Sequence, residues 1–205
     1  MSETFFHLTF VITFLVFTAI RAYYHRLAMA ARGKVEYREG KLHTGLRLVV
    51  GIPFMVVFFA YMIWPGIAGW AVIPLPLWAR WIGVIFSILS VPLILWIQRY
   101  LGSNFSTTLH VRDAHTLVTQ GPYRWVRHPM YSLLFVQLVG MLLVTANGLI
   151  GGVPLLAFIV IVVARIKNEE ATMIEKFGDE YRAYMRRTGR FLPRGILPRL
   201  KGMGI

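Results

Sequence analysis

Hydrophobic residues in this sequence gather into long runs, and polar and basic residues fill most of the segments between them. The first three runs span Thr4 to Ile20, Leu48 to Trp64 and Leu77 to Ile97. Each has about 17–21 residues, the length that an α-helix needs to cross the hydrocarbon core of a bilayer. Pro92 lies inside the third run and predicts a kink there. We therefore expect three transmembrane helices in the first half of the chain.

Two further runs lie close together and predict a helical hairpin. They span Met130 to Thr145 and Leu149 to Ala164, and only Ala146-Asn147-Gly148 joins them. Each has 16 residues, which favours a tight hairpin whose helices are tilted or partly shielded by protein. The predicted fold class is therefore all-α: a polytopic membrane protein with five transmembrane helices, the last two forming a tight hairpin.

The segments outside the hairpin have a different pattern. Leu101 to Arg127 alternates polar and apolar residues, without a run long enough to span a membrane. From Arg165 onward the chain is polar and basic, but one set of residues recurs at every fourth position: Glu169, Met173, Phe177 and Tyr181. This period predicts a tail helix whose apolar stripe docks on the membrane-embedded body.

Composition agrees with a membrane protein. Hydrophobic residues make up 57% of the chain and charged residues 15%, against about 45–50% and about 25% in soluble domains. The 205 residues suit a single domain over 1–205, with three spans in 1–98 and the remaining motifs in 99–205. Basic residues rather than a small-residue cleavage site follow the first run, which indicates a transmembrane helix instead of a cleaved signal peptide. The absence of cysteine excludes disulfides, thiolate metal sites and a cysteine nucleophile.

The basic residues also predict an orientation. The formal net charge is +13, and every Lys and Arg except Arg80 lies after the first run, between the third and fourth runs, or after the fifth. By the positive-inside rule, the amino terminus is outside and the carboxyl tail is cytoplasmic, which agrees with five crossings. Attraction to anionic lipid headgroups accounts for the charge. Since no nucleic-acid motif accompanies it, we expect membrane lipids and no nucleic acid as partners.

Three polar groups stand at the predicted cytoplasmic edge: His115 to Val118, Tyr123 with Arg127 to Tyr131, and Arg165 with Glu169-Glu170. Ionisable groups at such depth cost free energy unless they are paired or solvated, so each group is a candidate site. The second and third groups should converge, because they flank the same hairpin.

Structural roles alone would also account for parts of this pattern. Arg165 and Glu169 could form an ion pair between residues four apart on a helix. His128-Pro129 could be an interfacial turn, and Tyr123 and Tyr131 members of an aromatic belt. The other histidines lack companion ligands at metal spacing, so we expect no metal site.

Taken together, five motifs in order resemble the isoprenylcysteine carboxyl methyltransferase family. They are His-x-Leu-Val, Gly-x-Tyr, Arg-His-Pro-x-Tyr, Arg-x-x-x-Glu-Glu and Phe-Gly-x-x-Tyr-x-x-Tyr, and they run from His115 to Tyr184, about a third of the chain. That family belongs to a wider group of integral membrane methyltransferases that includes phospholipid methyltransferases. The resemblance implies S-adenosyl-L-methionine as the methyl donor, in a cytosol-facing pocket closed by the carboxyl-terminal helical tail, with S-adenosyl-L-homocysteine as the product.

The resemblance also implies roles for individual residues. Cofactor contacts are expected from nine of them: His115, Leu117, Val118, Tyr123, His128, Pro129, Met130, Tyr131 and Glu169. Arg165 would bind the substrate, because an arginine fork suits a carboxylate. Methyl transfer to an ionised carboxylate depends mainly on positioning and desolvation. An amine acceptor would need a general base, for which Glu170 or His128 is the candidate.

The expected function is carboxyl O-methylation of an isoprenylcysteine-like molecule, either a lipophilic small molecule or a prenylated substrate. Methylation of a phospholipid or of another amine or thiol is an alternative. A sterol-reductase-like NADPH oxidoreductase is another, although such enzymes usually carry an Arg-Asp pair followed by arginine where this chain has Asn168-Glu169-Glu170. A non-enzymatic membrane scaffold or channel is a third. The methyl acceptor and the oligomeric state stay open at this point.

Overall fold

Helices make up the regular structure of the computed structural model, which describes residues 3–30, 52–101 and 117–194. In chain order they are α1 (Glu3–Ala30), α3 (Ile52–Ile63), η2 (Pro65–Ala71), α4 (Leu77–Leu101), η4 (Gly121–Arg124), α5 (Pro129–Thr145), η5 (Gly148–Gly152) and α6 (Val153–Arg187). Those three ranges contain two isolated β-bridges and no strand. The predicted all-α class is confirmed for the part of the chain that is described.

Three helical segments are long and apolar enough to cross a membrane, namely Glu3–Leu27, Leu77–Leu101 and Gly148–Arg187. A fourth candidate is α3 taken together with η2, which are bent by 117° relative to each other. α5 is apolar but shorter. The described residues thus hold three to four candidate spans, so an integral membrane protein is supported and the count of five stays a prediction.

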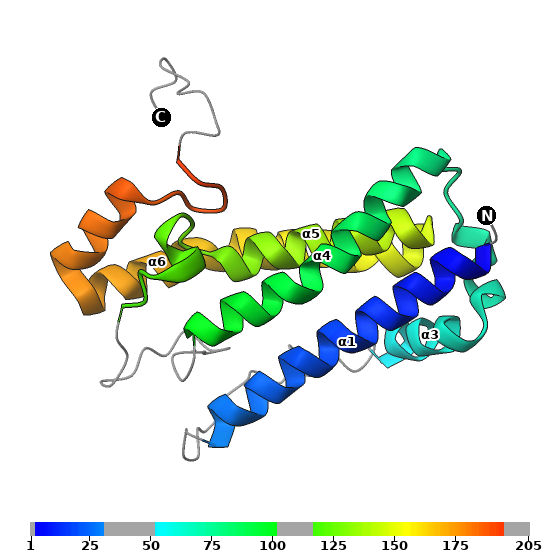
Figure 1. Ribbon diagram of the computed structural model, residues 1–205, viewed down its shortest axis with the longest axis horizontal. Helices are drawn as coiled ribbons and strands as arrows, with labels where there is room; N and C mark the ends of the chain where they lie inside the picture. Colours follow the sequence, from blue (N-terminus) through cyan, green and yellow to red (C-terminus); the bar gives the residue numbers. More distant parts are fainter. Residues whose placement is uncertain (1–2, 31–51, 102–116, 195–205) are drawn as a thin grey trace.

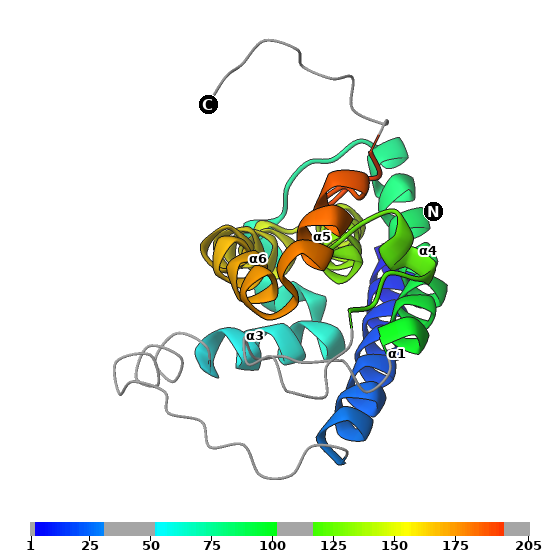
Figure 2. The same ribbon diagram turned by 90° about the vertical axis from the view of Figure 1, so that its left-hand side faces the viewer.

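α1, α4, α5 and α6 run roughly along the long axis of the molecule, whereas α3 lies across them (Figures 1 and 2). α4 packs against α5 on one side and α1 on the other, and α6 runs back along α5. Glycines let α4 and α5 approach closely, because a Cβ added to Gly83 would lie 2.7 Å from the backbone nitrogen of Val144. Small residues at such contacts drive helix association in lipid. α4 continues as one helix through Pro92.

A buried asparagine closes the turn between α5 and α6. Asn147 is 1% exposed, and its Oδ1 accepts hydrogen bonds from the backbone N–H groups of Leu149 and Ile150 at 3.1 and 3.0 Å. Its Nδ2 donates to the carbonyl of Ala68 at 2.8 Å. The side chain therefore caps the start of η5 and ties the hairpin to η2.

α6 extends well beyond the predicted end of the fifth apolar run. It continues past Ala164 to Gly178, where φ is +54° and ψ is −127°, a conformation that glycine adopts at little cost. After Gly178 the helix turns back toward the start of α5 (Figure 1), and Tyr181 and Tyr184 become buried. The predicted tail helix is therefore interrupted at Gly178: its first part continues α6, and its second part is a separate helical segment beyond the kink.

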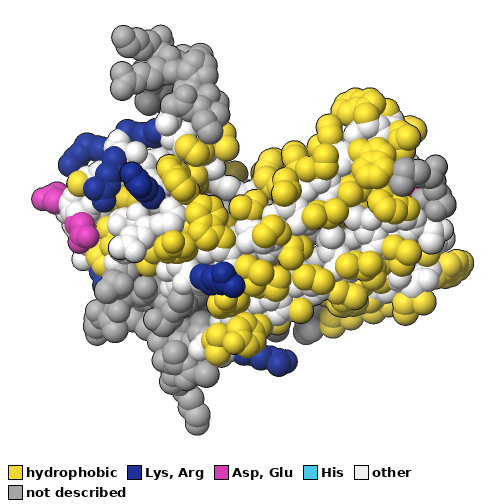
Figure 3. Space-filling view, viewed as in Figure 1, with side chains coloured by type: hydrophobic (Ala, Val, Ile, Leu, Met, Phe, Trp, Pro, Cys, Tyr) yellow, Lys and Arg dark blue, Asp and Glu magenta, His cyan; other side chains and the backbone are white. Residues whose placement is uncertain are grey.

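The surface separates into two zones (Figure 3). Hydrophobic side chains cover the body of the helical bundle, whereas Lys and Arg side chains gather mainly at the end that carries the folded-back tail. This separation is the one expected of a bundle immersed in lipid with one basic end at a membrane surface.

Candidate active site

The site is assembled where the chain enters α5. η4 and the residues after it lead to His128, which occupies the N-cap position, and Pro129 is the first residue of the helix. Proline suits that position because its φ is already helical and its missing N–H has no partner in the first turn. Gly121 adopts φ +57°, and a Cβ there would lie 2.5 Å from the Tyr100 ring. Glycine is thus required for the turn that leads into the site.

Three residues predicted to bind the cofactor come together at this point. The Tyr131 hydroxyl donates a hydrogen bond to Oε2 of Glu169 at 2.7 Å, and Nδ1 of His128 lies 3.7 Å from Oε1 of Glu169. The rings of His128 and Tyr131 stack with centroids 5.7 Å apart and planes 16° apart. The Glu169 side chain is 33% exposed, so this carboxylate keeps capacity for a further donor.

The neighbouring carboxylate, Glu170, is enclosed by cations. Its side chain is 6% exposed, and Oε1 accepts hydrogen bonds from Nε of Arg127 and Nε of Arg190, both at 3.1 Å. Oε2 accepts from the Arg190 guanidinium, and Nε2 of His128 lies 3.4 Å from Oε1.

The surroundings of Glu170 fix its ionisation. It lies in the polar part of α6, past the apolar run that ends at Ala164. Burial alone would raise the pKa of its carboxyl group, but the neighbouring His128 and hydrogen bonds from Arg190 and Arg127 outweigh burial and lower the pKa to about 2. A carboxylate held in this way is a poor proton acceptor at neutral pH, which argues against the predicted general-base role.

The same cluster fastens the tail to the entrance of α5. Backbone hydrogen bonds link residues 125–128 to residues 189–190 at 2.8 to 3.2 Å. The Arg127 guanidinium also donates to the carbonyls of Met185 and Thr188, and the Tyr184 hydroxyl donates to the carbonyl of Tyr123 at 2.6 Å. The docked tail therefore covers one side of the site.

The remaining predicted residues surround this core. Val118, Tyr123 and Met130 pack with Ile94 and Leu133 of α4 and α5 in a hydrophobic cluster, while Pro129 is buried and Leu117 is half-buried. Burial raises the pKa of the Tyr123 hydroxyl well above its ordinary value, so this residue stays neutral. His115 lies outside the described residues.

Arg165, the predicted substrate ligand, lies on α6 one turn before Glu169. It is half-buried and acts electrostatically on Tyr131, as does Arg21 of α1. The sequence indicated Arg21 only as an orientation signal. No local pattern reveals that a residue of the first helix faces the start of α5.

Two other buried or paired polar residues were missed by sequence reasoning. Arg190 was counted only among the basic residues of the tail. Gln98 of α4 is fully buried, and neither atom of its amide has a hydrogen-bond partner. A polar residue at the end of an apolar run carries no sequence signal that separates this position from an ordinary helix end.

Among the described residues, no group of three or more His, Cys, Asp or Glu side chains could hold a metal ion.

Comparison with known proteins shows which family the segment around the site resembles. Residues 81–175 match the model of the isoprenylcysteine carboxyl methyltransferase (ICMT) family. The chain is 37% identical over 106 residues to protein-S-isoprenylcysteine O-methyltransferase of Mus musculus, which covers 51% of this chain and 36% of the relative. It is 31% identical over 148 residues to cobalt-zinc-cadmium resistance protein CzcN of Cupriavidus metallidurans. That alignment covers 72% of this chain and 62% of the relative.

A solved structure supports the fold. The eukaryotic intramembrane Ras methyltransferase ICMT matches with a TM-score of 0.54 and 23% identity, over 91% of this chain and 68% of that one. The chain spans only 36% of the length of the first curated relatives that it matches. The match over residues 81–175 contains α5, most of α4 and the part of α6 that carries both glutamates. Over this segment, the chain is similar to the isoprenylcysteine carboxyl methyltransferase family.

Proposed function

We propose that this protein transfers a methyl group from S-adenosyl-L-methionine to a carboxylate of a lipophilic, isoprenylcysteine-like substrate. One observation carries the proposal: His128, Tyr131 and Glu169 converge at the entrance of α5, inside the segment that matches the methyltransferase family. The chain covers only part of the length of its curated relatives, so the activity of the whole protein rests on this local site.

The residues present suit the proposed cofactor. Glu169 is one-third exposed and uses one oxygen for Tyr131, so the other can accept from the ammonium group or ribose hydroxyls of the donor. Val118, Tyr123 and Met130 offer an apolar surface beside it. S-Adenosyl-L-methionine, when bound, supplies a methyl group on a positively charged sulfonium.

The chain's own residues would act by position and charge. Arg165 would orient the substrate carboxylate, and the docked tail would exclude water from the cytoplasmic side. An ionised carboxylate needs no proton removed before it is methylated. A reaction that needs no general base fits a site in which Glu170 is already paired with Arg127 and Arg190. The pairing therefore favours a carboxylate acceptor over an amine.

Calorimetry of the detergent-purified protein against S-adenosyl-L-homocysteine tests cofactor binding, with NADPH as the comparison ligand. We expect micromolar affinity for the first ligand and none for NADPH. Glu169→Ala should abolish binding, and Glu175→Ala should not, because Glu175 is exposed on the same helix. Binding of NADPH alone would support a reductase, and binding of neither ligand would support a scaffold or channel.

Turnover then tests the acceptor. A prenylcysteine with a free carboxylate should be methylated and its carboxamide should not, and Arg165→Ala should raise the KM for the carboxylate. If phosphatidylethanolamine were methylated instead, the acceptor assignment would be wrong while the cofactor assignment would stand.

A further inference from the structure

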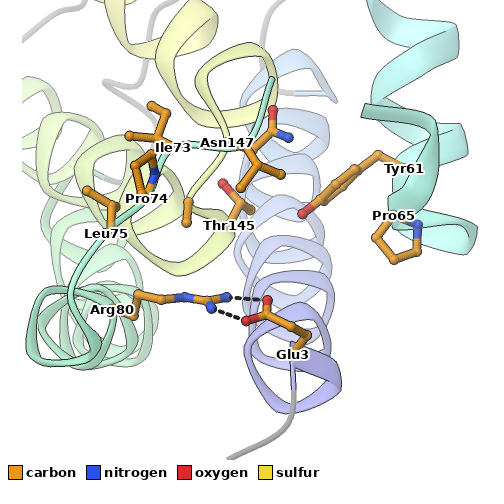
Figure 4. A pocket seen from close by; sticks show the side chains of 11 residues that line it. Glu3, Tyr61, Pro65, Ile73, Pro74, Leu75, Arg80, Thr145 and Asn147 are labelled. Carbon is orange, nitrogen blue, oxygen red and sulfur yellow. Dashed lines mark hydrogen bonds and ion pairs between the residues drawn. The ribbon is translucent and has the colours of Figure 1, made fainter. Parts of the chain in front are cut away.

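A cavity with charged and apolar lining lies at the opposite end of the bundle from the candidate active site. Its volume is about 470 Å³, and its lining comes from the start of α1, the end of α3, the start of α4 and the turn after α5. Figure 4 shows Arg80 and Glu3 on one side of this cavity, with Tyr61, Thr145 and Asn147 around it. None of these five residues belongs to the methyl-transfer site.

Arg80 is the fixed charge of this cavity. It is 9% exposed, its guanidinium lies 3.9 Å from the centroid of the Phe6 ring, and one NH2 hydrogen bond goes to the carbonyl of Val144 at 3.1 Å. Its Nε has no hydrogen-bond partner. A cation buried to this degree requires an anion, because an unpaired buried charge is strongly destabilising.

Glu3 is the anion that pairs with Arg80, and it is far more exposed than Arg80 is. Both oxygens of Glu3 accept from Arg80, one of them at 2.9 Å, but the Glu3 side chain is 83% exposed. An exposed carboxylate can exchange its partner for water at little cost. Arg80 therefore needs an anion in the cavity, whereas Glu3 does not need Arg80, so another anion can take the place of the carboxylate.

The position of the cavity indicates which anion is within reach. Trp64, Trp70 and Trp78 lie at this end of the bundle and are 65%, 79% and 67% exposed. Tryptophan gathers at the depth of the lipid headgroups. Val72 and Ile73 also line the cavity and are 60% and 36% exposed, so they provide apolar surface beside the charge. At this depth the most concentrated anion is the lipid phosphodiester.

We propose that this cavity binds the phosphodiester headgroup of a membrane lipid, which displaces Glu3 from Arg80. The guanidinium fork pairs with two phosphate oxygens, and the Tyr61 hydroxyl lines the cavity as a further donor. Basic side chains between membrane helices bind lipid headgroups through such charge pairing. Here it would fix the ends of α1, α3 and α4 together on the face opposite the catalytic one.

Native mass spectrometry of the delipidated full-length protein, titrated with dioleoylphosphatidylglycerol, tests the proposal. Arg80→Gln should weaken lipid binding by more than about tenfold, as expected when a buried charge pair loses its cation. Glu3→Gln should strengthen it, since the competing carboxylate is gone. Arg99→Gln is the matched control, because Arg99 is an exposed arginine at the other end of α4, and it should leave the titration unchanged.

The sign of the Glu3→Gln effect decides between a lipid site and a structural ion pair, and this variant keeps the buried arginine. If lipid binding were unchanged or weaker in Glu3→Gln, the pair would serve only to join α1 to α4 and the proposal would fail. Soluble glycerol phosphate, added as a competitor in the same titration, tests whether the site needs a lipid. If it competed as well as the lipid does, a free phosphate site would replace the lipid site.

Discussion

Adjacent residues of α6 have different partners and exposure at this site. Glu169 and Glu170 point about 100° apart around the helix, so one faces Tyr131 while the other faces Arg127 and the returning tail. The Glu169 side chain is 33% exposed and the Glu170 side chain is 6% exposed. Exposure and pairing therefore separate a carboxylate that can receive a ligand from one that anchors the tail.

Glu170→Gln should detach the tail from the entrance of α5. The change leaves Arg127, whose side chain is 8% exposed, without its anion, at a cost of about 3–5 kcal/mol. We expect a lower unfolding temperature and faster proteolysis after Gly178. Glu175→Gln, at an exposed position of the same helix, should behave like the wild type. An unchanged melting curve for Glu170→Gln would contradict the anchoring role.

The pH dependence of stability follows from the same residue. The pKa of Glu170 is lowered from 4.5 to about 2 in the folded protein, so the folded state favours the ionised form. The stabilisation is complete above about pH 4.5 and is lost as the pH falls toward 2. Thermal unfolding from pH 7 to pH 3 should show this acid-side decline in the wild type, and Glu170→Gln should lack that part of it.

At the scale of elements, the site depends on how closely the helices pack. α4 and α5 meet at Gly83 and Gly140. A Cβ added to Gly83 would lie 2.9 Å from the Gly140 carbonyl, and a Cβ added to Gly140 would lie 2.8 Å from the Ser87 hydroxyl. A hydrogen bond from Ser90 to Gln137 joins the same two helices. This packing sets the position of α5, and therefore of His128 and Tyr131 at its start.

Gly83→Ala should push α4 and α5 apart. The new methyl group would meet backbone atoms of α5, which cannot move aside as a side chain can, so we expect a loss of about 1–3 kcal/mol. A lower unfolding temperature in detergent would show this loss. At Gly69 a Cβ meets nothing within 4 Å, so Gly69→Ala is the control. Equal stability of the two variants would mean that the helices adjust without cost.

At the scale of the whole molecule, two chemically distinct ends are separated by an apolar body (Figures 1 and 3). One end holds the polar site and the docked tail, and the other holds the Arg80 cavity. The positive-inside rule predicts that the first end faces the cytoplasm. A water-soluble cofactor would then enter from the cytoplasm, and a lipophilic substrate from the bilayer.

The orientation can be tested directly, because the chain contains no cysteine. Gly69→Cys and Asp179→Cys each introduce one exposed thiol, the first in η2 and the second in the part of α6 beyond Gly178. These two segments lie at opposite ends of the bundle (Figure 1). A membrane-impermeant maleimide added to intact cells should label Gly69→Cys and should label Asp179→Cys only after permeabilisation. The reverse pattern would place the polar site on the outside.

The sequence alone determined the features that depend on local pattern. The apolar runs predicted the helices, with the third run at residues 77–97 and α4 at 77–101, and the fourth at 130–145 and α5 at 129–145. The motif order predicted the family that the comparisons support. These predictions succeed because hydrophobic length and residue order are properties of neighbouring residues.

Only the tertiary structure decided which distant residues meet. It showed that α6 continues to Gly178 before the tail returns, that Glu170 pairs with Arg127 and Arg190, and that Arg80 holds a carboxylate 77 positions earlier in the chain. The sequence marks each charge but not its partner. Pairing is determined by which helix faces which, and that arrangement follows from packing across the whole bundle rather than from any local period.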